Sequence, residues 1–257
     1  MQAYLQDLID TQFFAFLVIF MRFGLALMIM PGIGDSFVNA NVRLFFALSL
    51  CLVLTPALAA FMPAPPVQAA PLVGLLVSEA LIGMFIGSVM RIMISTLDTA
   101  GSIVSLQSGF SSALLFNPVS LGQGSLIGSV YSMLGVTLLM VLNMHHYMIA
   151  TIVDSYQIMP ATGAMPDLGT FSEVIVGVVG IAFKLGVQIS LPFIVVGLIM
   201  QMGLGVLGRL MPQIQIFFLA LPAQITIGLI ILSMTLATGM LFWANAYEAT
   251  IAQAITP

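Results

Sequence analysis

Four charged residues lie within or at the ends of long apolar stretches: Arg22, Glu79, Arg91 and Lys184. In a membrane such side chains are costly and usually face a bundle interior or water. They suit either a proton or ion relay in a transporter, or structural pairing between helices or subunits. Glu79 and Arg91 are twelve residues apart, about 18 Å along a helix, so they cannot pair with each other. Because the spacing indicates no relay, we favour Arg22, Glu79 and Lys184 as buried structural charges.

The remaining reactive residues indicate neither a metal site nor an active site. His145 and His146 are adjacent, so on a helix their side chains point about 100° apart. Two metal ligands on one helix need a spacing of three or four, and no acid or Cys stands at that spacing from either histidine. We expect both histidines to have a packing role in which their ring nitrogens are hydrogen-bonded. No Ser/His/Asp or Cys/His set can be assembled at a plausible depth, so we expect no enzyme activity and no cofactor.

Two glycine motifs favour helix packing. Gly203, Gly205 and Gly208 match the dinucleotide pattern G-x-G-x-x-G, but they follow a long apolar helix and not a strand. We interpret them as close helix packing or a flexible hairpin turn. Gly83 and Gly87 form a small-xxx-small motif, which is typical of closely packed membrane helices.

The elements that must position these residues are membrane helices. Of the 257 residues, 61% are hydrophobic and only 5% are charged, whereas a soluble domain carries about a quarter charged residues. The chain is therefore an integral membrane protein in contact with lipid. Its net charge of -4 argues against a nucleic-acid partner, which requires a basic face.

Six apolar stretches are long enough to span a bilayer, which takes about 20 residues. They cover residues 13–33, 44–62, 72–94, 126–153, 174–202 and 214–243. All should be helices, because open strand edges are not tolerated in lipid. We therefore predict an all-α membrane-associated fold of about six long helices. Arg43, Arg91 and Arg209 then fall on one face, which the positive-inside rule makes cytoplasmic, with both termini outside.

One linker differs from an ordinary solvated loop. Residues 95–125 are rich in Ser and Gly, and no charged residue occurs between Asp98 and Asp154. A polar but neutral segment suits backbone that is buried in protein or lines a pore at membrane depth.

Three segments resemble the FliR family, and with the six apolar stretches the resemblance covers essentially the whole chain. Residues 35–56 read DSFVNANVRLFFALSLCLVLTP, and residues 101–124 read GSIVSLQSGFSSALLFNPVSLGQG. Residues 183–221 resemble the closing hairpin of the family, with these residues in register: Gly205, Arg209, Pro212, Gln213 and Pro222. The chain has Asn117-Pro118 where the family commonly has Asp-Pro, so any role of that carboxylate does not carry over.

The resemblance implies a subunit of the flagellar type III export gate in the bacterial inner membrane, at the flagellar basal body. With FliP and FliQ it would form a channel for unfolded flagellar proteins, joined by FlhB on the cytoplasmic side. The fold would be a FliP-like part, residues 1–170 with a pore loop at 101–125, fused to a FliQ-like helical hairpin, residues 171–257. The alternatives are an injectisome subunit of the SctT type or a small secondary transporter.

Two sites follow from the resemblance together with the residues. The family places the loop at 109–125 inside the channel, where Phe110, Leu115 and Phe116 would seal the pore as a plug. Gly109 would provide a hinge, and Asn117-Pro118 would force a turn. The second site is Arg209 with Pro212 and Gln213 at the tip of the hairpin, which we expect to contact FlhB.

Overall fold

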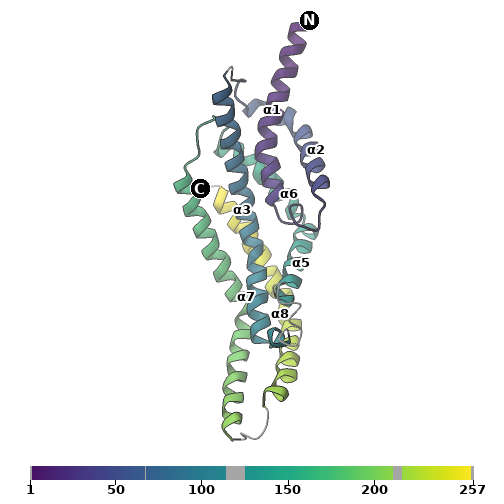
Figure 1. The fold of residues 1–257 in the computed structure, drawn as a ribbon, viewed down its shortest axis with the longest axis vertical. Coiled ribbons are helices and arrows are strands. Elements are labelled where there is room, and N and C mark those ends of the chain that lie inside the picture. The colour runs from purple at the N-terminus through teal and green to yellow at the C-terminus, as the bar shows by residue number, and fades with distance from the viewer. Residues whose placement is uncertain (1, 67, 114–124, 211–215, 256–257) are drawn as a thin grey trace. The chain divides into compact units, whose positions relative to one another are not determined.

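The computed structural model describes residues 2–66, 68–113, 125–210 and 216–255, and the regular structure in these ranges is helical. Figure 1 labels α1 to α3 and α5 to α8, and a short 3-10 helix, Ala59–Phe61, follows α2. The bounds of the α-helices are α1 Gln2–Ile29, α2 Ala40–Leu58, α3 Ala69–Gln107, α4 Phe110–Ala113, α5 Leu126–Val141, α6 Met144–Ile158, α7 Leu168–Leu210 and α8 Ile216–Ile255.

The described residues contain five helices that are long and apolar enough to cross a membrane, or six if α5 and α6 count as one broken span. This confirms the predicted all-α membrane fold. The stretch expected to form one span at 126–153 is instead bent by 75° between α5 and α6. Asn143 lies at the break with a positive φ of 58°, a conformation that Asn tolerates better than most residues.

Three helices are at least ten residues longer than the apolar stretches that predicted them. The helices α3, α7 and α8 have 39, 43 and 40 residues, and each is about 60 Å long at 1.5 Å per residue. That is about twice the thickness of the hydrocarbon core, so part of each helix must lie outside it.

The expectation that the neutral linker begins at residue 95 is wrong, because α3 continues to Gln107. Leu97, Ala100 and Val104 are buried at helical spacing, so this segment has the apolar stripe of a packed helix despite its Ser and Thr content. One of its hydroxyls bonds within the helix, where Thr99 Oγ1 donates to Ser95 O at 3.0 Å, whereas Thr96 Oγ1 is buried without a partner among the described residues. A polar, uncharged composition is therefore compatible with helix here.

The chain divides into two compact units, and α3, α7 and α8 each contribute to both. Unit 1 comprises Met1–Ile92, Leu139–Val178 and Glu248–Pro257, and unit 2 comprises Met93–Leu138 and Val179–Tyr247. The division of the chain into a FliP-like and a FliQ-like part near residue 170 stays a prediction.

In unit 1, α1 packs closely against α3 through the predicted glycine motif. A Cβ on Gly83 would overlap the backbone oxygen of Arg22, and one on Gly87 would lie 2.9 Å from Ala26 O. The absence of side chains at these two positions lets the helix backbones approach, which confirms the motif as a close helix contact.

In unit 2, Trp243 of α8 is fully buried and its Nε1 donates to Met93 O of α3 at 2.9 Å. A second close approach brings α3 to α5, where a Cβ on Gly101 would overlap Gly128. A buried indole nitrogen usually finds a hydrogen-bond acceptor, so the hydrogen bond from Trp243 to Met93 O fixes α8 on α3 within the unit.

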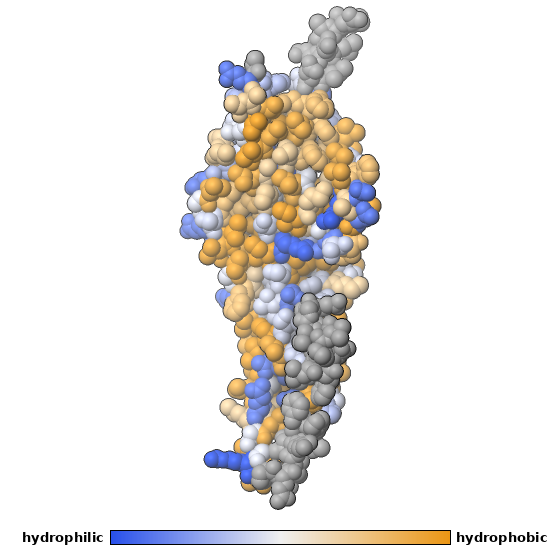
Figure 2. Space-filling model, viewed as in Figure 1, coloured by the Kyte–Doolittle hydropathy of each residue, from blue (hydrophilic) through white to orange (hydrophobic). Residues whose placement is uncertain are grey.

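Apolar side chains also cover much of the surface. Figure 2 shows mostly hydrophobic residues on the visible face, with hydrophilic ones in small groups. Phe45, Val176 and Met234 are 67%, 71% and 76% exposed. Exposed apolar area on this scale needs lipid or other protein chains to cover it.

Candidate functional site

A buried ion pair lies within unit 1. Arg22 of α1 and Glu79 of α3 have 0% and 1% exposed side chains. Arg22 Nε donates to Glu79 Oε2 at 2.7 Å, and Nη2 donates to Glu79 Oε1 at 2.8 Å. This two-point geometry is the strongest form of an arginine–carboxylate contact. The sequence placed both charges in apolar stretches but gave no signal that they pair.

Helix α6 and Met159, the residue that follows it, complete the surroundings of the Arg22 guanidinium. Nη1 donates to Ser155 Oγ at 3.0 Å, and Nη2 donates to Met159 O at 2.8 Å. The guanidinium carbon lies 3.8 Å from the centre of the Tyr156 ring, within cation–π distance. Arg22 thus connects α1, α3 and α6. Because both charges are enclosed and compensated, the arrangement suits structural pairing.

A second set of contacts in unit 1 holds the segment between α1 and α2. Arg91 Nη1 pairs with Asp35 Oδ1, and Asp35 Oδ2 accepts a hydrogen bond from Gly32 N at 2.7 Å. Arg43 Nη1 donates to Gly34 O at 3.0 Å. Arg43 and Arg91, which the sequence placed on one face of the membrane, therefore contact the same short segment.

The predicted plug begins where α3 ends in unit 2. Gly109 has a positive φ of 76°, the conformation that glycine commonly adopts just after a helix. Phe110 then begins the four-residue helix α4. The other predicted plug residues, Leu115, Phe116, Asn117 and Pro118, lie outside the described residues, so the plug stays a prediction.

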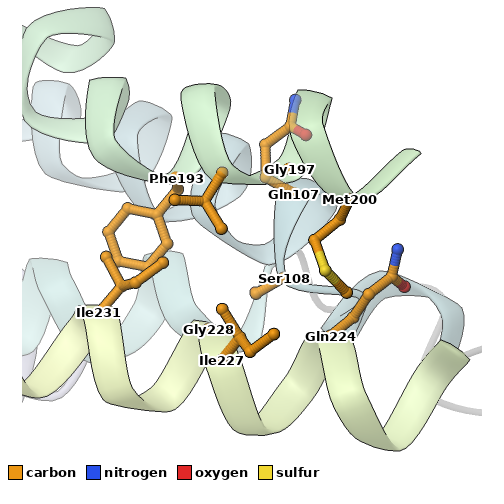
Figure 3. Close-up of a pocket in the computed structure, with 10 residues that line it drawn as sticks. Gln107, Ser108, Phe193, Gly197, Met200, Gln224, Ile227, Gly228 and Ile231 are labelled. Carbon is orange, nitrogen blue, oxygen red and sulfur yellow. The ribbon is translucent and has the colours of Figure 1, made fainter. Parts of the chain in front are cut away.

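The end of α3 is held in a narrow cleft between α7 and α8, all in unit 2 (Figure 3). Its lining includes Gln107 at the end of α3, Ser108 directly after it, Phe193 from α7 and Gln224 from α8. The free space is about 10 Å³, close to what one water molecule requires. A Cβ on Gly228 would overlap Ser108 Cβ. This packing fixes the point at which the chain leaves α3 toward the predicted plug.

The other predicted site residues lie on α7 and beyond it. Arg209 is exposed near the end of α7, whereas Pro212 and Gln213 lie outside the described residues. Lys184 is also exposed, unlike Arg22 and Glu79. The burial that we expect for Lys184 is therefore not provided by the described part of this chain, and it stays a prediction.

No metal centre is found in the described part of the chain, where no group of three or more His, Cys, Asp or Glu residues could hold an ion. The rings of His145 and His146 lie 4.2 Å apart and are tilted by 37°. Among the described residues, His145 Nδ1 is buried without a hydrogen-bond partner, so the expected hydrogen bond is missing at that atom.

Asp167 lies directly before α7 and caps its first turn. Its Oδ2 accepts from Thr170 Oγ1 at 2.7 Å, and its Oδ1 accepts from Gly169 N at 2.9 Å. The hydrogen bond from Thr170, followed by that from Gly169, lowers the pKa of the Asp167 carboxyl, since both stabilise the charged form.

Comparison with known proteins identifies the family. Residues 13–250 match the family described as Bacterial export proteins, family 1. The flagellar biosynthetic protein FliR of Caulobacter vibrioides is 39% identical over 231 residues, which cover 90% of this chain and 92% of that protein. FliR of Bacillus subtilis is 27% identical over 96% of this chain and 95% of that protein, and FliR of Escherichia coli is 29% identical over 77% and 75%. Because the match extends from α1 to α8, the chain belongs to the bacterial export proteins of family 1, the family that its sequence resembles.

Proposed function

We propose that this protein is a subunit of the flagellar type III export gate in the bacterial inner membrane. With FliP and FliQ it forms the channel through which unfolded flagellar proteins leave the cell, and FlhB joins on the cytoplasmic side. The single observation that carries the proposal is the 39% identity to a flagellar biosynthetic protein over 90% of the chain.

Two physical features support a role inside a larger assembly. Helices α3, α7 and α8 are each about twice as long as a bilayer core requires, and large apolar side chains are exposed on all three. Apolar surface that extends beyond the lipid needs protein neighbours to cover it. A transporter that couples protons through Glu79 is less favoured, because Arg22 binds both oxygens of that carboxylate.

The test is deletion of the gene followed by complementation with a tagged copy. We expect the deletion strain to lose motility and flagellar export, and the tagged chain to co-purify with FliP-like and FliQ-like subunits. Loss of injectisome secretion with motility intact would favour the SctT alternative. A chain that purifies alone, from cells in which the deletion does not affect export, would contradict the proposal.

We further propose that the segment from Gly109 onward is the plug of the gate. Two features support this role. The end of α3 is packed between α7 and α8, which fixes the start of the segment, and the segment lacks charge. Replacing Phe110 and Phe116 with Gly should make membranes leaky to small ions while the complex still assembles. The matched control is Phe37→Gly, which removes an exposed aromatic side chain from the loop between α1 and α2, outside the segment. Assembled mutant complexes that remain tight to ions would contradict the plug.

A further inference from the structure

The outward face of α7 in unit 2 carries a charge amid apolar residues. Gly180, Lys184, Gln188, Leu191 and Val195 follow one another at spacings of three or four and are all exposed, so they share one face of the helix. We call these five residues the Lys184 face. The opposite side of α7 is buried in unit 2 through Ala182, Leu185, Ile189 and Phe193.

Lys184 cannot reach the end of its apolar stretch. No other charged residue occurs between Glu173 and Arg209, and the ten residues that precede Lys184 after Glu173 extend about 15 Å along the helix. That is farther than the four methylene groups of a lysine reach. A lysine close to a helix end can bring its ammonium to the headgroups, but this one is too deep in its stretch to do so.

The described residues of unit 2 place no acidic side chain against Lys184. Asp98 is the only carboxylate in the sequence of unit 2. Asp98 lies at about the level of Lys184 along the helices. The reason is that Thr96 and Gly186, each two residues away from one of them, are in contact: a Cβ on Gly186 would be 3.2 Å from Thr96 O. The Asp98 carboxylate is directed toward α5, however, where Oδ1 lies within 2.6 Å of a Cβ placed on Gly128. Among the described residues no acceptor contacts the Lys184 ammonium, since the ion pairs found there involve Arg22 and Arg91.

We propose that the Lys184 face packs against a membrane helix of a different subunit, and that this helix carries an Asp or Glu at the level of Lys184. The inference rests on the proposed function, which places the chain among other subunits. Charged side chains within membrane segments usually face a bundle interior and pair with one another, so charge complementarity favours a partner helix that carries an acid. A side chain on Gly180 would meet nothing within 4 Å, so the partner backbone can approach closely at this position.

The first experiment measures recovery of the purified gate complex with Lys184 variants. We expect Lys184→Arg to give recovery within twofold of wild type, because the charge is kept. Lys184→Glu should reduce recovery at least tenfold, because two carboxylates would then face each other. The matched control is Glu173→Lys, a charge reversal at an exposed residue of the same helix before the apolar stretch, which should stay within twofold.

The second experiment identifies the partner. A photo-crosslinking benzoylphenylalanine at Gln188 should capture a helix of another gate subunit that holds an Asp or Glu within two turns of the crosslink. Changing that acid to Lys should restore recovery of the Lys184→Glu complex to within threefold of wild type. Capture of lipid, of a second copy of this chain or of a helix without an acid would overturn the inference.

The two proposals fail in different ways. Normal recovery of the Lys184→Glu complex would overturn the inference about the Lys184 face and leave the proposed function intact. A wild-type chain that co-purifies with no other subunit would overturn the proposed function, and the inference would fall with it.

Discussion

Replacing Glu79 with Gln removes the charge opposite Arg22 with almost no change of shape. In the wild type both carboxylate oxygens accept hydrogen bonds from Arg22, at 2.7 and 2.8 Å. In the variant one oxygen becomes an NH2 group that cannot accept. Ser155 Oγ and Met159 O still accept from the guanidinium, but neither carries a negative charge. Arg22, which is 0% exposed, is left as an uncompensated buried cation.

The size of the effect follows from this burial. Removing one partner of a buried ion pair costs about 3–5 kcal/mol of folding free energy. Since each 1.4 kcal/mol is a factor of ten, the population of the opened state should rise about 100-fold to 4,000-fold.

Cys51 provides the assay. It is the only cysteine of the chain and is fully buried in unit 1, the unit that holds the ion pair. A maleimide can label it only when the unit opens, so the labelling rate of the purified chain reports the open population when closing is fast. We expect the rate of Glu79→Gln to rise by the factor given above.

The double variant Arg22→Met/Glu79→Leu tests the cause. Replacing both members of a buried ion pair with apolar residues is often neutral or stabilising, so its labelling rate should fall to within about tenfold of wild type. A double variant as unstable as Glu79→Gln would show that lost packing, and not an uncompensated charge, explains the effect. A labelling rate for Glu79→Gln within about threefold of wild type, a shift far below the one expected for a buried ion pair, would refute the reasoning altogether.

Three further outcomes are expected. Gly83→Leu should speed Cys51 labelling strongly, because its side chain overlaps the backbone of α1, whereas Gly74→Leu on the same helix meets open space; equal effects would contradict the close contact. Arg209→Glu should weaken FlhB co-purification and motility while FliP and FliQ stay bound, and unchanged FlhB recovery would contradict the predicted contact. The pKa of the Asp167 carboxyl is lowered, so the cap that it forms on α7 is complete above the ordinary pKa of about 3.9 and is lost as pH falls through the lowered value. An NMR titration midpoint of Asp167 at or above about 3.9 would contradict the lowered pKa.

Composition and local pattern determined the class of the protein. With 5% charged residues and six apolar stretches, helices are the available structure in lipid, and the regular structure of the described residues is helical. The contact at Gly83 and Gly87 was also predictable, because a pair of small residues at a spacing of four marks a close helix surface. The helix ends were less predictable: α3 continues through residues 95–107, because buried Leu, Ala and Val at helical spacing stabilise a helix whose composition resembles a loop.

Tertiary structure decided the partners of the charges. Arg22 and Glu79 are 57 residues apart, and no local rule distinguishes Glu79 from Asp35 or Asp98 as the acceptor for Arg22. The choice depends on how α1 and α3 pack, which Gly83 sets by admitting the backbone of Arg22. The sequence likewise placed Arg22 and Lys184 in the same category, as charges within apolar stretches. Only the packed helices show that Arg22 is enclosed by its own chain while Lys184 is exposed on α7, because burial depends on which face of each helix its neighbours cover.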